Sequence, residues 1–390
     1  MAEPSAFEQR DIIAFLDSLY EGDLHAKRVL SMANATRGIL ASCSLAVHAI
    51  GQGLAHVQGT MTKHGVKQVD RLLSNRGIEL AGFFKRWVPY VLRNRSEAVV
   101  ALDWTYFEPD QQQTLMLSLL SGQGRSIPLM WHTIRTQNLK GYQASYEDDL
   151  LRDFKRVLPA DVKVTVVADR GFGHTNMFYL LEHELGFEYV IRIQGRFKVI
   201  SAKGEARSAT DWVGANGRAR TLRDACITAK HEQQVGTVVC VQAKDMKTPW
   251  CLVASDRSAT AAKLMSYYAK RWGIETTFRD MKDLRFGYGM GELRIKDPER
   301  RDRLLLLSTL AMSLLTLLGQ AGEELGYDRH LKANTVKTRT HSLFRQGAML
   351  YDLALNMPEE RLRPLLERFC KLLNEQRLFN ETFGFPVAVE

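Results

Sequence analysis

The stretch Tyr268-Ala-Lys-Arg271-Trp-Gly-Ile-Glu275-Thr-Thr-Phe-Arg279-Asp-Met-Lys282 decides how the rest of the chain is interpreted. Side chains of a helix advance by about 100° per residue, which brings five polar residues onto one arc of about 80°: Tyr268, Arg271, Glu275, Arg279 and Lys282. Apolar residues share a neighbouring arc: Tyr267, Ile274, Phe278 and Met281. The pattern predicts an amphipathic helix that holds one carboxylate among several cations. Taken alone, it fits equally a site for metal ions and phosphates or a solvated face with a Glu-to-Arg pair at i,i+4.

A mixed sheet is predicted before this helix. Runs rich in β-branched and aromatic residues predict an antiparallel meander of three strands near 98–107, 114–120 and 127–134, then strands at 162–169 and 189–193. One helix is expected at about 146–158, before the strand at 162–169, and a second helix ends at about 185, between the last two strands. The order β-β-β-α-β-α-β is typical of an α/β sheet flanked by helices.

Two acidic residues, Asp103 and Asp169, are expected at or near the carboxyl ends of strands in this sheet. Ligands of open α/β sheets bind at such ends. Carboxylate oxygens are what Mg²⁺ or Mn²⁺ requires, and Glu275 supplies a third. Three such groups can hold two ions, which suits in-line attack on a phosphodiester. Each acid alone has a structural alternative: Asp103 could cap a turn, and Asp169 could pair with Arg170.

The remaining segments predict a small antiparallel β insertion at about 195–248, a strand at 250–255 and a long helix from about 259 to 283. Three helices are expected after a glycine-rich bend, near 298–324, 341–355 and 358–376. Because 390 residues exceed one typical core, we expect more than one domain. The predicted boundaries are 1–96 for a helical DNA-binding domain, 97–285 for the catalytic domain and 286–390 for a helical C-terminal domain.

One segment of the predominantly helical N-terminal region, 62–75, predicts a helix that presents basic side chains to solvent: Lys63, Lys67, Arg71 and Arg76. It could be a recognition helix in a DNA groove or a basic surface helix of a bundle. The formal net charge of +9 favours a polyanionic partner, without separating DNA from RNA or an acidic membrane surface.

The cysteines and the apolar segments restrict the class of protein. Five scattered cysteines, none in a Cys-x-x-Cys pair, argue against a disulfide framework and a zinc site. No signal peptide is visible. The apolar run 304–318 is short for a membrane span, which needs about 20 residues, and is expected to be a buried core helix. A cytoplasmic protein without a membrane partner is predicted.

Six positions resemble the insertion-sequence transposases of the DDE superfamily, specifically family four of the bacterial insertion sequences. The hallmark of that family is Tyr, two residues, Arg, three residues, Glu, six residues, Lys, and the chain carries it as Tyr268, Arg271, Glu275 and Lys282. The aspartates of the family match Asp103 in Leu-Asp-Trp-Thr and Asp169 in Ala-Asp-Arg-Gly-Phe. The resemblance covers about 97–285 and implies a ribonuclease-H-like core with a β insertion.

The resemblance also implies roles for these residues. Asp103, Asp169 and Glu275 would be catalytic and would hold two Mg²⁺ or Mn²⁺ ions. The DNA-binding residues would include three that bind phosphates near the transposon end: Tyr268, Arg271 and Lys282. Arg279 projects to the same place by helical geometry, although the signature does not require it.

Three further residues have a role in the resemblance or a position close to its motifs. Trp250 stands where relatives place an aromatic that stacks on a flipped base, although a core position is an equal alternative. Arg192 is a candidate contact for the DNA backbone. His174 is expected to be a surface residue at a helix start rather than a metal ligand.

The function implied is that of a cut-and-paste DNA transposase. It would nick each transposon end, form and reopen a hairpin with the released 3′-hydroxyl, and join the end to target DNA, as a homodimer on paired ends. Two alternatives stay open: a ribonuclease-H-like nuclease without strand transfer, and a catalytically silent DNA-binding repressor of transposition. The three acids disfavour the repressor, because without metal they would repel a phosphate backbone.

Overall fold

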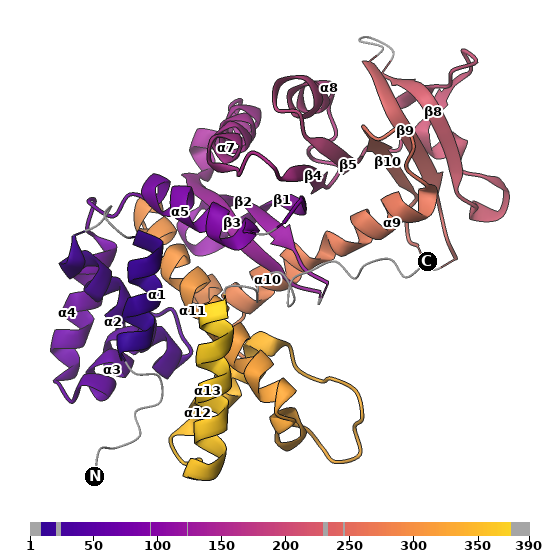
Figure 1. Cartoon of the computed structure of the whole chain (residues 1–390). Helices are drawn as coiled ribbons and strands as arrows, with labels where there is room; N and C mark the ends of the chain where they lie inside the picture. Colours follow the sequence, from indigo (N-terminus) through magenta and orange to yellow (C-terminus); the bar gives the residue numbers. More distant parts are fainter. Residues whose placement is uncertain are drawn as a thin grey trace.

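The computed structural model describes residues 9–20, 25–93, 95–122, 124–228, 233–244 and 246–375. Its strands form one ten-stranded sheet in the order β3-β2-β1-β4-β5-β10-β9-β8-β6-β7. In Figure 1, helices α1–α5 lie beyond the β3 end of this sheet and strands β8 and β9 lie at the opposite end. Helices α12 and α13 project away from the sheet. The predicted fold class, a mixed α/β sheet flanked by helices with helical terminal regions, is therefore confirmed.

Strands β1 to β5 have the expected ribonuclease-H-like order. Strands β1 (Glu97–Phe107), β2 (Gln112–Leu120) and β3 (Ser126–Arg135) form the antiparallel meander. Strand β4 (Lys163–Ala168) pairs in parallel with β1, and β5 (Glu188–Arg192) pairs in parallel with β4. The first half of β1 and most of β4 are buried on both faces, as expected of the centre of a sheet covered by helices.

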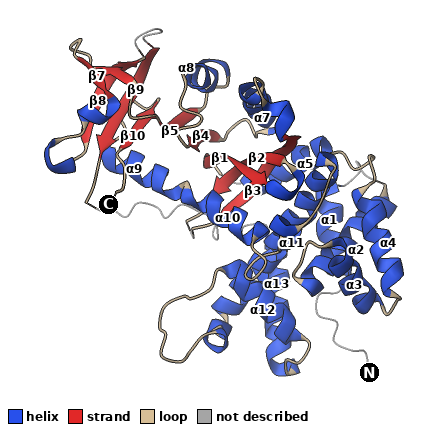
Figure 2. Cartoon of the chain, turned by 180° about the vertical axis from the view of Figure 1, so that it is seen from behind, coloured by secondary structure: helices blue, strands red, loops and turns tan. Residues whose placement is uncertain are grey.

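Helices cover both sides of this half (Figure 2). On one side lie α7 (Gln143–Val157) and α8 (Thr175–Tyr179), the latter continued by a π-helical turn at Leu180–Glu184. On the other side run α9 (Ala261–Lys270) and α10 (Trp272–Lys282). A short helix, α6 (Thr136–Leu139), follows β3.

The β insertion continues the sheet of β1 to β5 rather than forming a sheet of its own. Its strands are β6 (Lys198–Ile200), β7 (Ala206–Ser208), β8 (Arg220–Ile227) and β9 (Gln233–Val241). Strand β10 (Trp250–Ala254) pairs antiparallel with β5 on one side and with β9 on the other. The insertion is therefore fixed rigidly to the strand that precedes α9.

The single helix predicted over 259–283 is wrong in one detail, because it is divided at Arg271. The N–H of Arg271 donates to the carbonyl of Tyr268 (3.1 Å), and the N–H of Ile274 donates to the carbonyl of Arg271 (3.0 Å). These i→i−3 bonds tighten one turn. Since φ and ψ of Arg271 stay helical at −49° and −33°, the predicted polar stripe survives the interruption.

The described residues of the N-terminal region form the helices α1 (Gln9–Tyr20), α2 (Ala26–Ser42), α3 (Val47–Gln58), α4 (Thr62–Leu73) and α5 (Leu80–Leu92). Helices α3 and α4 cross closely, since a Cβ added at Gly65 would lie 2.1 Å from the carbonyl oxygen of Gly51. Only glycine fits this crossing, and it sets the angle of α4 against the bundle.

The C-terminal region contains α11 (Pro298–Glu324), α12 (Leu343–Ala354) and α13 (Glu359–Glu375). Among the described residues, α11 is the one helix long and apolar enough to cross a membrane by composition, but 89% of its apolar window is buried inside the protein. Helices α2 and α3 meet the same criterion only as a pair bent by 98°. The prediction of a buried core helix at 304–318 is confirmed.

Candidate active site

The sheet register brings Asp103 and Asp169 side by side. The parallel ladder between β1 and β4 ends with Leu102 opposite Ala168, so the two aspartates are the next residues on neighbouring strands. Asp103 does not leave its strand as expected, because β1 continues to Phe107 by pairing with β2. Asp169 directly follows the last residue of β4.

The polar stripe on α9 and α10 faces these two aspartates. The Tyr268 hydroxyl donates to Asp169 Oδ1 at 2.9 Å. Arg271 donates through Nη1 to Asp103 Oδ2 at 2.9 Å and through Nη2 to Glu275 Oε1 at 2.5 Å. The three acids thus come from β1, the β4 end and α10 and meet through two side chains of the stripe. Sequence spacing alone left this arrangement undecided.

The two aspartates differ in their pKa values. Burial raises the pKa of Asp103 to about 6, and the charge of Arg271 opposes this rise. Burial acts in the same direction on Asp169, but the Arg170 N–H and the Tyr268 hydroxyl outweigh it and hold the pKa of Asp169 below its usual range. A cation beside Asp103 would favour the ionised form of this carboxyl group.

In the structure, Arg271 supplies positive charge between these acids. Its side chain is 9% exposed, whereas those of Asp103 and Glu275 are 20% and 32% exposed. Among the described residues, its Nε has no hydrogen-bond partner. A buried donor without a partner is uncommon in folded proteins.

Lys282 and Arg279 occupy different surroundings one turn further along α10. Lys282 Nζ donates to the Tyr106 carbonyl (2.6 Å) and to Thr105 Oγ1 (3.3 Å), so it is tied to β1. Burial lowers the pKa of Lys282. Arg279 is exposed and lines an open groove of about 1000 Å³ together with Glu275 and Lys282.

Trp250 and Arg192 both lie beside Tyr268. The Trp250 ring packs edge-on against Tyr268, with ring centroids 4.8 Å apart. Arg192 Nη2 donates to Thr248 Oγ1 (2.9 Å) and to the Pro249 carbonyl (3.0 Å). Both residues therefore border the end of the site that contains Asp169.

His174 lies apart from the three acids, at the start of α8. Its Nδ1 accepts from the Met177 N–H (3.2 Å), and its Nε2 is 3.9 Å from Glu147 Oε2. The sequence suggested a surface position for His174, whereas its ring is partly buried.

Two residues with contacts that position the site, Trp104 and Thr277, had no sequence signal strong enough to identify them. The Trp104 N–H donates to Asp103 Oδ1 (2.9 Å), and its indole N–H donates to the buried Glu147 (2.8 Å). On the far side of α10, the fully buried Thr277 hydroxyl accepts from Ser126 N (2.9 Å). The available but weak signal for Thr277 was its position as a polar residue on the helix face opposite the stripe.

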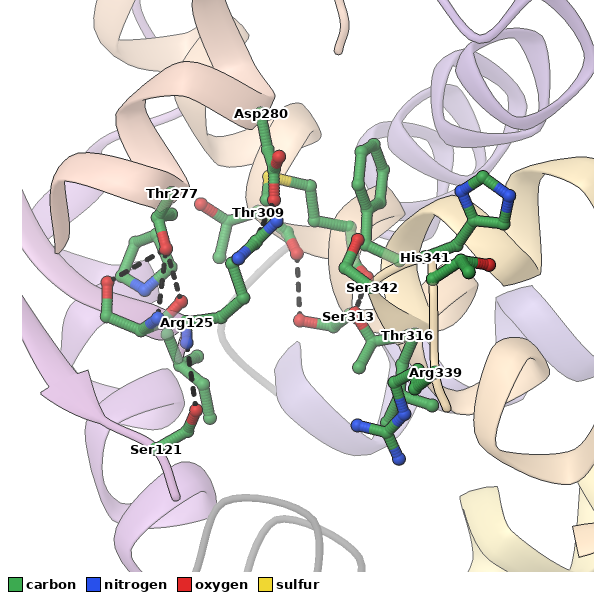
Figure 3. Close-up of a pocket in the computed structure, with 17 residues that line it drawn as sticks. Ser121, Arg125, Thr277, Asp280, Thr309, Ser313, Thr316, Arg339, His341 and Ser342 are labelled. Carbon is green, nitrogen blue, oxygen red and sulfur yellow. Dashed lines mark hydrogen bonds and ion pairs between the residues drawn. The ribbon is translucent and has the colours of Figure 1, made fainter. Parts of the chain in front are cut away.

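Figure 3 shows this far side of α10, where Thr277 and Asp280 border a cavity of about 290 Å³. Two residues that line this cavity pair with each other, since Arg125 Nε donates to Asp280 Oδ2 at 2.6 Å. The three acids do not line this cavity, which is therefore separate from the candidate active site.

The donor set of the site fits a hard divalent cation. Three carboxylates converge there, and the described residues provide no thiolate or imidazole among them. No three His, Cys, Asp or Glu side chains in the described part of the chain are already arranged around one ion. The guanidinium group of Arg271 lies between Asp103 and Glu275.

Comparison with known proteins gives one family match. Residues 133–314, slightly less than half of the chain, match the family described as the transposase DDE domain. The matched range includes Asp169 and Glu275, while Asp103 lies before it. No curated protein matches the chain. The family match supports a transposase of the DDE superfamily, an enzyme class that acts on DNA and generally uses divalent metal ions.

Proposed function

We propose that the chain is a cut-and-paste DNA transposase with Asp103, Asp169 and Glu275 as its catalytic residues. The observation that carries this proposal is the meeting of three acids from separate segments through the side chains of Tyr268 and Arg271. It would cleave at the ends of an insertion element and transfer the 3′-hydroxyl into target DNA. The site of action would be the bacterial cytoplasm, on DNA of the nucleoid.

The three acids would hold two Mg²⁺ or Mn²⁺ ions through their oxygen atoms. Bound ions of this kind activate the attacking oxygen and stabilise the leaving oxygen of a phosphodiester. Tyr268, Arg271 and Lys282 would orient the scissile strand by donating to its phosphates, since fixed donors raise the rate by positioning. Arg192 and the exposed Arg279 would contact the DNA backbone farther out.

A hairpin intermediate is part of the proposal and depends on Trp250. Hairpin formation bends a strand sharply, and an extruded base can be stabilised by stacking on an aromatic ring. The half-buried position of Trp250 against Tyr268 supports this role, because it lies next to the proposed phosphate contacts.

Residues 1–96 would recognise the element ends through α4. A three-residue turn, 59–61, connects α3 to α4, as in helix-turn-helix proteins. Exposed basic residues of α4 face solvent: Lys63, Lys67 and Arg71, with Arg76 just beyond the helix. Arg300 of α11 donates to Asp70 Oδ1 (2.5 Å) and Ser74 Oγ (2.6 Å), which would fix this helix relative to α11 of the C-terminal region.

A homodimer on paired ends completes the proposal. Cutting and joining both ends of one element needs two active sites, and each chain has one such site. The C-terminal region 286–390, in which α12 and α13 project from the sheet, would contribute to that contact.

The test uses linear double-stranded DNA that carries the inverted repeats flanking this gene. With Mg²⁺, the wild-type chain should release the element and leave hairpin ends. Asp103→Asn should retain end binding in a gel-shift assay and lose cleavage, because it keeps the shape and removes the charge. Cleavage by Asp103→Asn at the wild-type rate would refute the assignment.

A second assay separates the alternatives. Precleaved ends with a free 3′-hydroxyl are offered together with a target plasmid. Joined product supports a transposase, and cleavage without joining indicates a nuclease. Binding without either reaction by the wild-type chain indicates a repressor.

A further inference from the structure

Arg271 forms ion pairs with two of the three carboxylates that a metal ion would need. Its guanidinium group donates to Asp103 and Glu275, from two different elements, and is less exposed than either acid. A divalent cation that binds both carboxylates has to displace these contacts, because its charge and the charge of the guanidinium group repel each other at the same carboxylates.

We propose that Arg271 couples metal binding to DNA binding, by pairing with the acids in the free protein and with a DNA phosphate in the complex. This inference rests on the proposed function and concerns the regulation of the same site. The free enzyme would bind divalent metal weakly, and DNA would make the acids available.

The hydrogen bonds of Arg271 support a second binding partner. A guanidinium group has five N–H donors, and its Nε–H and one Nη–H together match two oxygens of a phosphate. The Nε of Arg271 has no acceptor in the described structure. Pairing with a phosphate would satisfy this buried donor, which the two carboxylates leave unsatisfied.

A phosphate can approach from the open groove on this side of the protein. Glu275 lines that groove together with Arg279, Lys282 and the exposed Arg294. Trp272, the next residue after Arg271, is 56% exposed. The cations would attract a phosphate backbone to the edge of the site, close to the Arg271–Glu275 pair.

Coupling follows because both ligands require the same ion pairs to break. Metal alone must displace Arg271, and so must a phosphate that takes its guanidinium group. When both bind, the pairs break once, so each ligand increases the affinity for the other by the same factor. Couplings of this kind typically change an affinity by roughly 5- to 150-fold.

The experiment measures Mn²⁺ binding to the full chain by calorimetry and by electron paramagnetic resonance. Wild type, Arg271→Gln and Arg285→Gln are compared without DNA and with a duplex carrying one terminal repeat. Arg285 is an exposed cation just beyond α10, so its variant removes the same charge without touching the acids. Thermal melting confirms that each variant is folded.

We expect Arg271→Gln to bind Mn²⁺ about tenfold or more tightly than wild type without DNA. Arg285→Gln should bind Mn²⁺ as wild type does. The duplex should raise the Mn²⁺ affinity of wild type more than that of Arg271→Gln. Arg271→Lys is measured in parallel in case the glutamine variant is unstable. It should bind Mn²⁺ with intermediate affinity, since one ammonium group cannot pair with both carboxylates as the guanidinium group does.

Equal or weaker Mn²⁺ binding by Arg271→Gln and Arg271→Lys, relative to wild type, would overturn the inference and leave the proposed function intact. Failure of the proposed function has a different signature. If Asp103→Asn leaves Mn²⁺ affinity unchanged in both the wild-type and the Arg271→Gln background, the metal does not bind at these acids, and both proposals are wrong.

Discussion

The two sides of helix α10 are built differently. On the side that faces Asp103, Arg271 holds Glu275 by an ion pair that other ligands could replace, and its Nε lacks an acceptor. On the opposite side, the buried Thr277 binds Ser126 through its hydroxyl group, and Arg125 pairs with Asp280. One side is suited to exchange partners, and the other fixes the helix to β3.

Under the proposed function, the side of α10 that faces Asp103 takes part in the reaction, and the opposite side holds the helix in place. A carboxylate that must bind a cation needs a helix that does not move, and the contacts of Thr277 and Asp280 provide that. Changes on the two sides should therefore have different results. On the front side, which faces Asp103, we expect a loss of activity without unfolding, and on the rear side, which contacts Ser126, a loss of stability.

The largest effect is expected for Glu275→Gln on the front side. Metal ions supply several kcal/mol of transition-state stabilisation, and about 1.4 kcal/mol is tenfold in rate. Cleavage of end DNA should fall roughly a thousandfold, while the melting temperature changes little because Glu275 is partly exposed. Single-turnover cleavage and thermal melting measure the two quantities. Cleavage within a few-fold of wild type would mean that Glu275 is not a catalytic residue.

A smaller effect, of another kind, is expected for Thr277→Val on the rear side. The variant keeps the shape and leaves the buried Ser126 N–H without its acceptor, which costs about 1–3 kcal/mol of stability. Thr277→Ser should restore most of it. Denaturant unfolding measures this difference. Equal free energies of unfolding for wild type and Thr277→Val would show that the contact does not hold α10.

The smallest effect is expected for Thr309→Val, the matched control on the neighbouring α11. Thr309 is 1% exposed, and its hydroxyl oxygen has no hydrogen-bond partner among the described residues. Removing an unsatisfied buried hydroxyl should leave stability unchanged or raise it slightly. If Thr309→Val destabilised the chain as much as Thr277→Val, the loss would reflect buried threonines in general rather than the contact with Ser126.

Part of the site could be predicted from the sequence because it depends on regular geometry. Asp103 comes after the apolar first half of β1 and Asp169 follows β4, and strands that pair in parallel bring such residues together. The helical stripe likewise placed Glu275 and Arg271 on one face. The fold class followed from the same two periodicities.

The remaining features depend on tertiary contacts that no local pattern contains. Helical geometry placed Arg271 and Arg279 on the same arc, yet Arg271 is buried between the acids and Arg279 is exposed in the groove. The pairing of Trp104 with Glu147 joins segments 43 residues apart. Distances in the folded chain, rather than spacing along it, decide such contacts.

The most direct test of the central claim is a change of metal specificity at Asp103. In Asp103→Cys, a thiolate replaces the carboxylate, and thiolates bind Mn²⁺ better than the strictly oxygen-seeking Mg²⁺. The variant is offered end DNA with each metal in turn. If Asp103 is a metal ligand, Asp103→Cys should cleave with Mn²⁺ and fail with Mg²⁺. Equal cleavage with both metals, at the wild-type rate, would contradict the account.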